Sequence, residues 1–175
     1  MRKTLVLMFV LSAVNCFSQN VEEYLPVEMN TGQIPSCYEF RQSSDSGLDN
    51  FLKVIVGGGA DVVLKLVRNN DNACIRYVYV RSDETYSLRN IPAGIYYLKI
   101  AYGNDWAVSK TGGDCSAKFL RNNLYQVGTD LLDFNPVRDS EGTQIPSYEL
   151  ILKTIAGNPG NEFQAENITE DEFNK

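Results

Sequence analysis

Residues 85–102 read TYSLRNIPAGIYYLKIAY, and this stretch decides the fold class. Two β-like runs, at residues 85–88 and 95–102, lie on either side of the turn Asn-Ile-Pro-Ala-Gly. Pro92 has a fixed φ and no N–H, and Gly94 can adopt a positive φ at little cost. Because these properties let a chain reverse without clashes, the stretch predicts two paired strands joined by a tight turn.

Short β-like runs of the same kind occur on both sides of this stretch, and turn residues separate them. No long helical period interrupts them, and residues 103–106 are predicted to turn the chain. We therefore predict an all-β fold, an antiparallel β-sandwich of about seven to eight strands. The predicted strands cover residues 51–56, 61–67, 75–81, 85–88, 95–102, 119–127, 131–134 and 148–155.

The N-terminal 18 residues are predicted to be a signal peptide. A basic start precedes an apolar run at residues 5–14, and small side chains then favour cleavage before Gln19. The run is too short for a permanent membrane span, and no later stretch is long enough. We expect a secreted or periplasmic protein. Lipid attachment at Cys16 is an alternative, although Asn15 is polar where a small residue is usual.

The remaining chain is predicted to have three parts. Residues 19–50 are polar and rich in Pro, Gly and Ser, which predicts a lead-in with little core of its own. Residues 51–156 would form the sandwich, and residues 157–175 an acidic tail. At the end of the tail, Thr169 and Glu172 have the spacing of a capping box, which predicts a short helical turn.

The charge balance excludes some partners. With Arg2 and Lys3 removed, the 16 basic residues become 14 against 22 acidic ones, and the formal net charge changes from −6 to −8. An acidic chain without a Lys/Arg run does not suit nucleic acid or an anionic lipid surface.

Three cysteines follow the predicted signal peptide, and an oxidising compartment would allow one disulfide. Sequence alone leaves all three pairings open, and three free thiols remain an alternative. Cys37 and Cys115 lie in polar, turn-rich contexts, whereas Cys74 begins a strand-like run. We therefore favour a Cys37–Cys115 disulfide, a short edge strand at residues 37–40, and Cys74 as a small buried residue.

The pattern Y-x-L-x-N-I-P-A-G-x-Y-x-L at residues 86–98 resembles that of carboxypeptidase regulatory-like, prealbumin-like and Cna-B-like β-sandwich modules. The likeness covers about residues 51–102. It implies an accessory, adhesive or stalk-like domain on an exported protein. Residues 103–134 have no counterpart in the generic pattern of these modules.

Catalysis is not expected. The chain has no histidine, which removes the usual proton carrier near neutral pH and excludes Ser-His-Asp and Cys-His sites. The cysteines are scattered and the Asn/Asp runs are ordinary turn chemistry, so we expect no metal and no cofactor. A small hydrolase that uses only carboxylates remains an alternative.

A binding or structural role is therefore the leading hypothesis, with an unknown protein or glycan at the cell envelope as partner. Tyr102, Trp106 and Tyr125 form the candidate recognition patch, because aromatic side chains on loops can stack on sugars or anchor a partner. The alternative is that Trp106 closes the end of the core. A secreted inhibitor or effector is another possibility, with residues 109–114 as its protruding loop.

Overall fold

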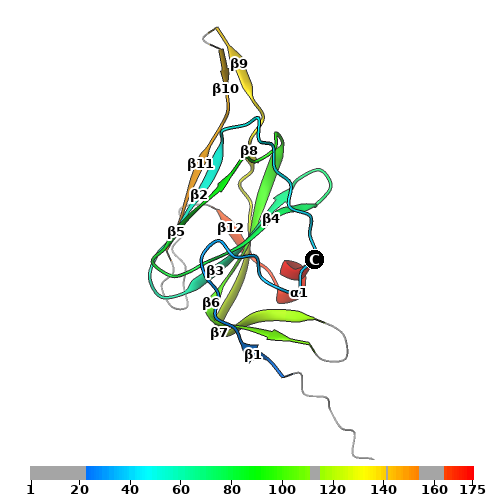
Figure 1. The fold of residues 1–175 in the computed structure, drawn as a ribbon, viewed down its shortest axis with the longest axis vertical. Helices are drawn as coiled ribbons and strands as arrows, with labels where there is room; N and C mark the ends of the chain where they lie inside the picture. The colour runs from blue at the N-terminus through cyan, green and yellow to red at the C-terminus, as the bar shows by residue number, and fades with distance from the viewer. Residues whose placement is uncertain (1–22, 111–114, 141, 154–163) are drawn as a thin grey trace, which may run out of the picture.

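The computed structural model of the protein describes residues 23–110, 115–140, 142–153 and 164–175. These residues contain twelve β-strands and one short helix (Figure 1). The elements are β1 (Leu25–Pro26), β2 (Phe51–Val56), β3 (Asp61–Arg68), β4 (Cys74–Val80), β5 (Thr85–Arg89), β6 (Ile95–Ser109), β7 (Ser116–Gly128), β8 (Leu132–Asp133), β9 (Val137–Asp139), β10 (Gly142–Gln144), β11 (Tyr148–Leu152), β12 (Ala165–Asn167) and α1 (Glu170–Asn174).

Two sheets form the all-β fold, as predicted. The large sheet has the order β12-β7-β6-β3-β4, with β1 and β8 also paired to β6. The small sheet has the order β11-β2-β5, and β9 and β10 form a separate hairpin. All neighbours are antiparallel except β11 and β2, which are parallel. The sheets are thus mostly antiparallel, as predicted, and this one pair departs from that arrangement.

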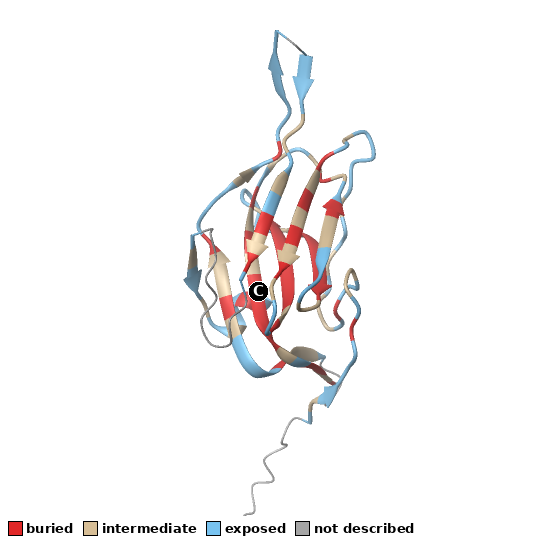
Figure 2. Ribbon diagram, turned by 90° about the vertical axis from the view of Figure 1, so that its left-hand side faces the viewer, coloured by how far each residue is buried: buried red, intermediate tan, exposed pale blue. Residues whose placement is uncertain are grey.

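Apolar side chains from both sheets meet in an inter-sheet core. In β2, Leu52, Val54 and Val56 are buried and alternate with partly exposed residues, as expected for a strand with one covered face. The large sheet contributes from β3, β4 and β6, and Phe134 and Tyr96 make an edge-to-face contact within this core. Figure 2 shows the buried residues concentrated in these strands and the β9–β10 hairpin exposed beyond them.

The turn at residues 90–94 connects the two sheets. It does not join paired strands, because β5 belongs to the small sheet and β6 to the large one. Asn50 holds the turn in place: its Nδ2 donates to Ile91 O at 2.9 Å and its Oδ1 accepts from Ile91 N at 2.7 Å. Tyr96 adds a bond from its hydroxyl to Pro92 O. The predicted hairpin is therefore corrected to an inter-sheet crossing.

Strand β6 continues past the predicted turn at residues 103–106. Its pairing with β7 shifts register between Tyr102 and Asn104, which marks a bulge. Gly103 lies in this bulge and packs so closely on Phe119 that a Cβ there would clash. Beyond the bulge, Trp106 and Phe119 pack on Tyr79 of β4. The end of the β6–β7 hairpin therefore covers the outer face of the large sheet.

A second core forms on this outer face. It is separate from the inter-sheet core and includes Val63, Tyr77 and Tyr79 from the sheet, together with Trp106 and Phe119 from the hairpin. The two ends of the described chain complete its cover. Met29 contributes from the N-terminal side, and Phe173 of α1 from the C-terminal side.

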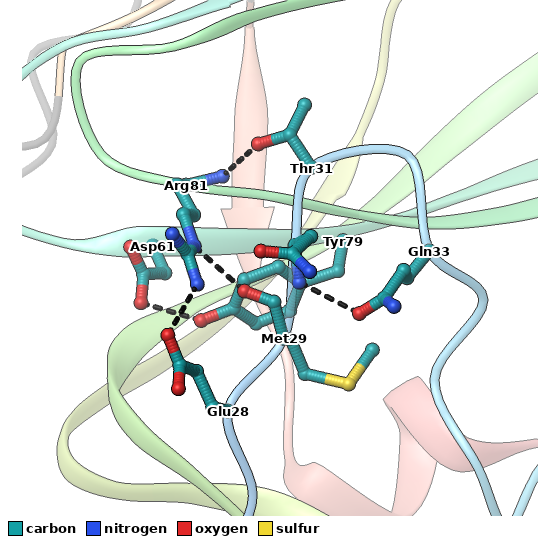
Figure 3. Close-up of polar contacts among 8 residues, drawn as sticks. Glu28, Met29, Thr31, Gln33, Asp61, Tyr79 and Arg81 are labelled. Atoms are coloured by element: carbon teal, nitrogen blue, oxygen red, sulfur yellow. Dashed lines mark hydrogen bonds and ion pairs between the residues drawn. The ribbon is translucent and has the colours of Figure 1, made fainter.

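Residues 24–43, here called the strap, run across this outer face. Gly32 and Gln33 exchange backbone hydrogen bonds with Tyr79, so the strap covers part of the β4 edge. Arg81 fastens the strap further, with Nε donating to Met29 O at 2.6 Å and Nη2 donating to Glu28 (Figure 3). The expectation that residues 19–50 have little core is therefore corrected for the strap, which also packs Tyr38 and Phe40 on the second core.

The predicted Cys37–Cys115 disulfide is confirmed, and it ties the strap to the start of β7. Cys74 is a free thiol that is partly buried. Residues 37–40 are not a strand, because Cys37 adopts φ 70° in a turn.

The capping box is confirmed at α1. Thr169 Oγ1 accepts from Glu172 N, and Glu172 Oε2 accepts from Thr169 N at 2.8 Å. The predicted signal peptide, Cys16 and residues 157–163 of the predicted tail lie outside the described residues. Within the described ranges, no helix is long and apolar enough to cross a membrane.

Candidate functional site

The predicted recognition patch does not form an exposed surface. Tyr102 is 3% exposed and belongs to the inter-sheet core. Trp106, 3% exposed, and Tyr125, 8% exposed, belong to the second core on the opposite face of the sheet. Buried aromatic side chains on two different faces cannot together hold a ligand. The alternative interpretation, that Trp106 closes a core, agrees with the structure.

A group of lysines on the outer face of the large sheet is the better candidate. Lys65 lies at the centre of β3 and Lys99 in the first half of β6, and the register pairs them directly. Each follows a buried leucine and precedes another buried apolar residue, so the alternation of a strand turns both lysines to the outer face. Two cations therefore lie side by side beneath the strap and α1.

Lys65 is buried, with 1% of its surface exposed. Its Nζ donates to Phe173 O at 2.7 Å and lies 3.4 Å from the centre of the Tyr38 ring. The ring of Phe173 provides a second π face at 4.5 Å. Burial lowers the pKa of the Lys65 ammonium from its usual 10.5 to about 7. Near neutral pH this ammonium is therefore close to its point of half-titration.

Lys99 is half-buried and donates from Nζ to Glu172 O at 2.6 Å. Both lysines thus bind carbonyls in the last turn of α1, where cations suit the exposed carbonyl groups. Burial also lowers the pKa of Lys99. Neither lysine forms an ion pair with a carboxylate of the described chain. An ammonium has three donors, so positive charge and donor capacity are left over on this face.

These lysines line a small cavity of about 260 Å³, here called the lysine pocket. Lys175 supplies a third cation, and Tyr97 donates from its hydroxyl to Asn72 in the wall. The complete lining is Tyr38, Lys65, Val67, Asn72, Tyr97, Lys99 and Lys175.

The neutral groups around the pocket hold their protons firmly. Burial raises the pKa of the Cys74 thiol to about 11, so this cysteine is not a ready nucleophile. Burial raises the pKa of Tyr38 and Tyr97 as well. Glu172 is the nearby acid, and its carboxylate already accepts the capping bonds of Thr169. The pocket therefore offers donors and positive charge, which suit an anion.

The signal for this site was present in the sequence as a lysine within each of two apolar strands, Leu-Lys-Leu and Leu-Lys-Ile. The sequence has no run of basic residues, so neither lysine stands out by its neighbours. Lys65, Lys99 and Lys175 converge only when β3, β6 and the C-terminal segment come together.

The proposed protruding loop at residues 109–114 lies mostly outside the described residues. The element that visibly protrudes is the β9–β10 hairpin, whose six strand residues are all exposed (Figures 1 and 2). Comparisons of the chain with protein-family models, with curated proteins and with solved structures gave no match. The resemblance stated from residues 86–98 therefore stays a prediction.

Proposed function

We propose that the protein is an exported, non-catalytic binding module of the cell envelope, and that it binds an anionic group in the lysine pocket. The observation that supports the proposal most directly is the pairing of Lys65 with Lys99 beneath a cavity that also contains Lys175. A chain of net charge −6 places three cations around one hollow and pairs the two central ones with backbone carbonyls instead of acids.

The chemistry of the pocket favours binding over turnover. Lys99 and Lys175 can donate charge-assisted hydrogen bonds, which are stronger than neutral ones. Tyr97 and Asn72 offer a ring face and an amide beside them. The described lining contains no carboxylate or imidazole side chain to act with a lysine in proton transfer.

The proposal is tested by calorimetric titration of the purified protein with acetate and with sulfate. We expect both anions to bind, and we expect each to be recovered chemically unchanged. The double variant Lys99→Met, Lys175→Met should lose affinity by about tenfold or more, because it removes two charged donors. Lys110→Met changes an exposed lysine elsewhere and serves as the matched control.

A melting curve of each variant tests whether the fold is retained. Equal anion affinity in the double variant and in the control would overturn the proposal. So would the absence of binding in the unmodified protein.

A further inference from the structure

A second hollow of about 520 Å³ adjoins the lysine pocket on the side of β7. The two hollows share Tyr97, Lys99 and Lys175, so one ligand can occupy both. The lysine pocket is smaller than most small-molecule sites, which measure about 300–1,000 Å³, and the second hollow falls within that range. The smaller hollow therefore suits a head group and the larger one suits the rest of a molecule.

The lining of the second hollow is more apolar than that of the lysine pocket. Val127, Leu131 and Ile168 line it together with the ring of Tyr97. Leu131 is 53% exposed at the edge of this open hollow, so its side chain is accessible to a ligand. Glu172 also lines this hollow; the capping bonds from Thr169 lower the pKa of its carboxylate, which therefore stays charged, beside the two cations Lys99 and Lys175.

From this arrangement we infer that the ligand of the lysine pocket is an amphipathic carboxylate with a single hydrocarbon chain. This inference rests on the proposed function and names its ligand class. The carboxylate accepts hydrogen bonds from Lys99 and Lys175, and the chain lies along Val127, Leu131 and Ile168. Charge complementarity fixes the head, and burial of methylene groups against Leu131 supplies most of the affinity.

The experiment compares acetate, hexanoate and octanoate in calorimetric titrations, with 1-octanol as a neutral ligand of the same chain length. We expect affinity to rise by about fourfold for each methylene group that becomes buried. Octanol should bind at least tenfold more weakly than octanoate, because it has no charge for the lysines.

Two variants separate the head from the chain. Leu131→Ser should reduce the affinity for octanoate toward that for acetate and leave acetate binding unchanged. Lys99→Met with Lys175→Met should weaken both. Val137→Ser, which changes another exposed apolar residue in the β9–β10 hairpin, is the matched control and should change neither.

Each outcome has a distinct meaning. Acetate binding without any dependence on chain length would overturn this inference and leave the proposed function standing. The absence of all anion binding would overturn both. Equal binding of octanol and octanoate would show that the hydrocarbon chain binds without recognition of the carboxylate. This result would also overturn the inference.

Discussion

Lys65 and Lys99 are direct neighbours across β3 and β6, and each donates to a carbonyl of α1, at 2.7 Å to Phe173 O and 2.6 Å to Glu172 O. Two like charges in register would ordinarily destabilise a sheet. Here the carbonyls at the end of α1 and the rings of Tyr38 and Phe173 offset the repulsion. The same contacts hold the C-terminal helix on the second core.

Stability should depend on pH through Lys65. Because its pKa is about 7 in the folded protein and about 10.5 in the unfolded chain, the unfolded state binds more protons between these values. The free energy of unfolding should therefore rise with pH, by up to about 2 kcal/mol between pH 7 and 9. Cys74 contributes in the opposite direction, because burial raises its thiol pKa from the usual 9.0 to about 11, and this contribution begins near the upper end of the window.

Urea unfolding of Lys65→Met across the same window checks this expectation. The variant has no ammonium to bury, so its stability should change much less with pH. Lys110→Met should keep the original slope. A variant at residue 65 with an unchanged slope would mean that another group controls the pH dependence.

Anion affinity should depend on pH in the opposite direction. The protonated form of Lys65 attracts an anion in the lysine pocket, and this form disappears as pH rises through about 7. The affinity for acetate should therefore fall several-fold between pH 6 and 8.5. The other titratable groups that line or adjoin the pocket are Tyr38, Cys74, Tyr97, Lys99, Glu172 and Lys175.

Titrations of acetate at several pH values measure this dependence. In Lys65→Met, provided that it folds, the affinity should be lower and nearly constant from pH 6 to 8.5. If the variant and the unmodified protein show the same pH profile, the protonation of Lys65 does not control anion affinity.

Removal of the disulfide should be costly. Cys37 and Cys115 are separated by 78 residues, and their bond holds the strap on the β6–β7 hairpin. Replacing both by Ala should lower the free energy of unfolding by about 2–5 kcal/mol. Cys74→Ala is the control and should change stability less, because this side chain is only partly buried and forms no disulfide. A smaller loss in the double variant than in the control would contradict the structural role of the bond.

Gly103 should not tolerate a side chain. A Cβ at this position would collide with Cβ and Cγ of Phe119, which is fully buried. Gly103→Ala should therefore cost about 1–3 kcal/mol in thermal or chemical unfolding, as overpacked cores do. Gly58→Ala meets only the end of the flexible Asp83 side chain, so it is a suitable control. Equal stability of the two variants would show that the hairpin can move away from the sheet.

Local chemistry explains which features could be predicted from sequence. Alternation located the principal strands, and the spacing of Thr169 and Glu172 located the helix cap, because both signals lie within a few residues. The context of Cys37 and Cys115 was enough to favour their pairing over the two alternatives. Each of these features depends on short-range patterns.

The errors concern long-range geometry. Pro92 and Gly94 specify a change of direction, but they do not specify whether the next strand pairs with the last or enters the other sheet. The bend at Gly103 depends on Phe119, sixteen residues later, so the local Gly-Asn-Asp sequence looked like an ordinary turn. Trp106 was expected on a loop because it follows this apparent turn in the sequence. The lysine pocket was missed because its three cations are far apart along the chain.

The second core also sets an order for folding. It includes both Met29 and Phe173, so its cover needs segments near both ends of the described chain. We expect contacts of such large sequence separation to form late, because the entropy cost of closing a long loop comes before the contacts that offset it. The inter-sheet core can assemble first from β2–β6, with the parallel strand β11 joining later. A chain that is synthesised from its N-terminus would therefore leave Lys65 and Lys99 uncovered until α1 is available to pack on them.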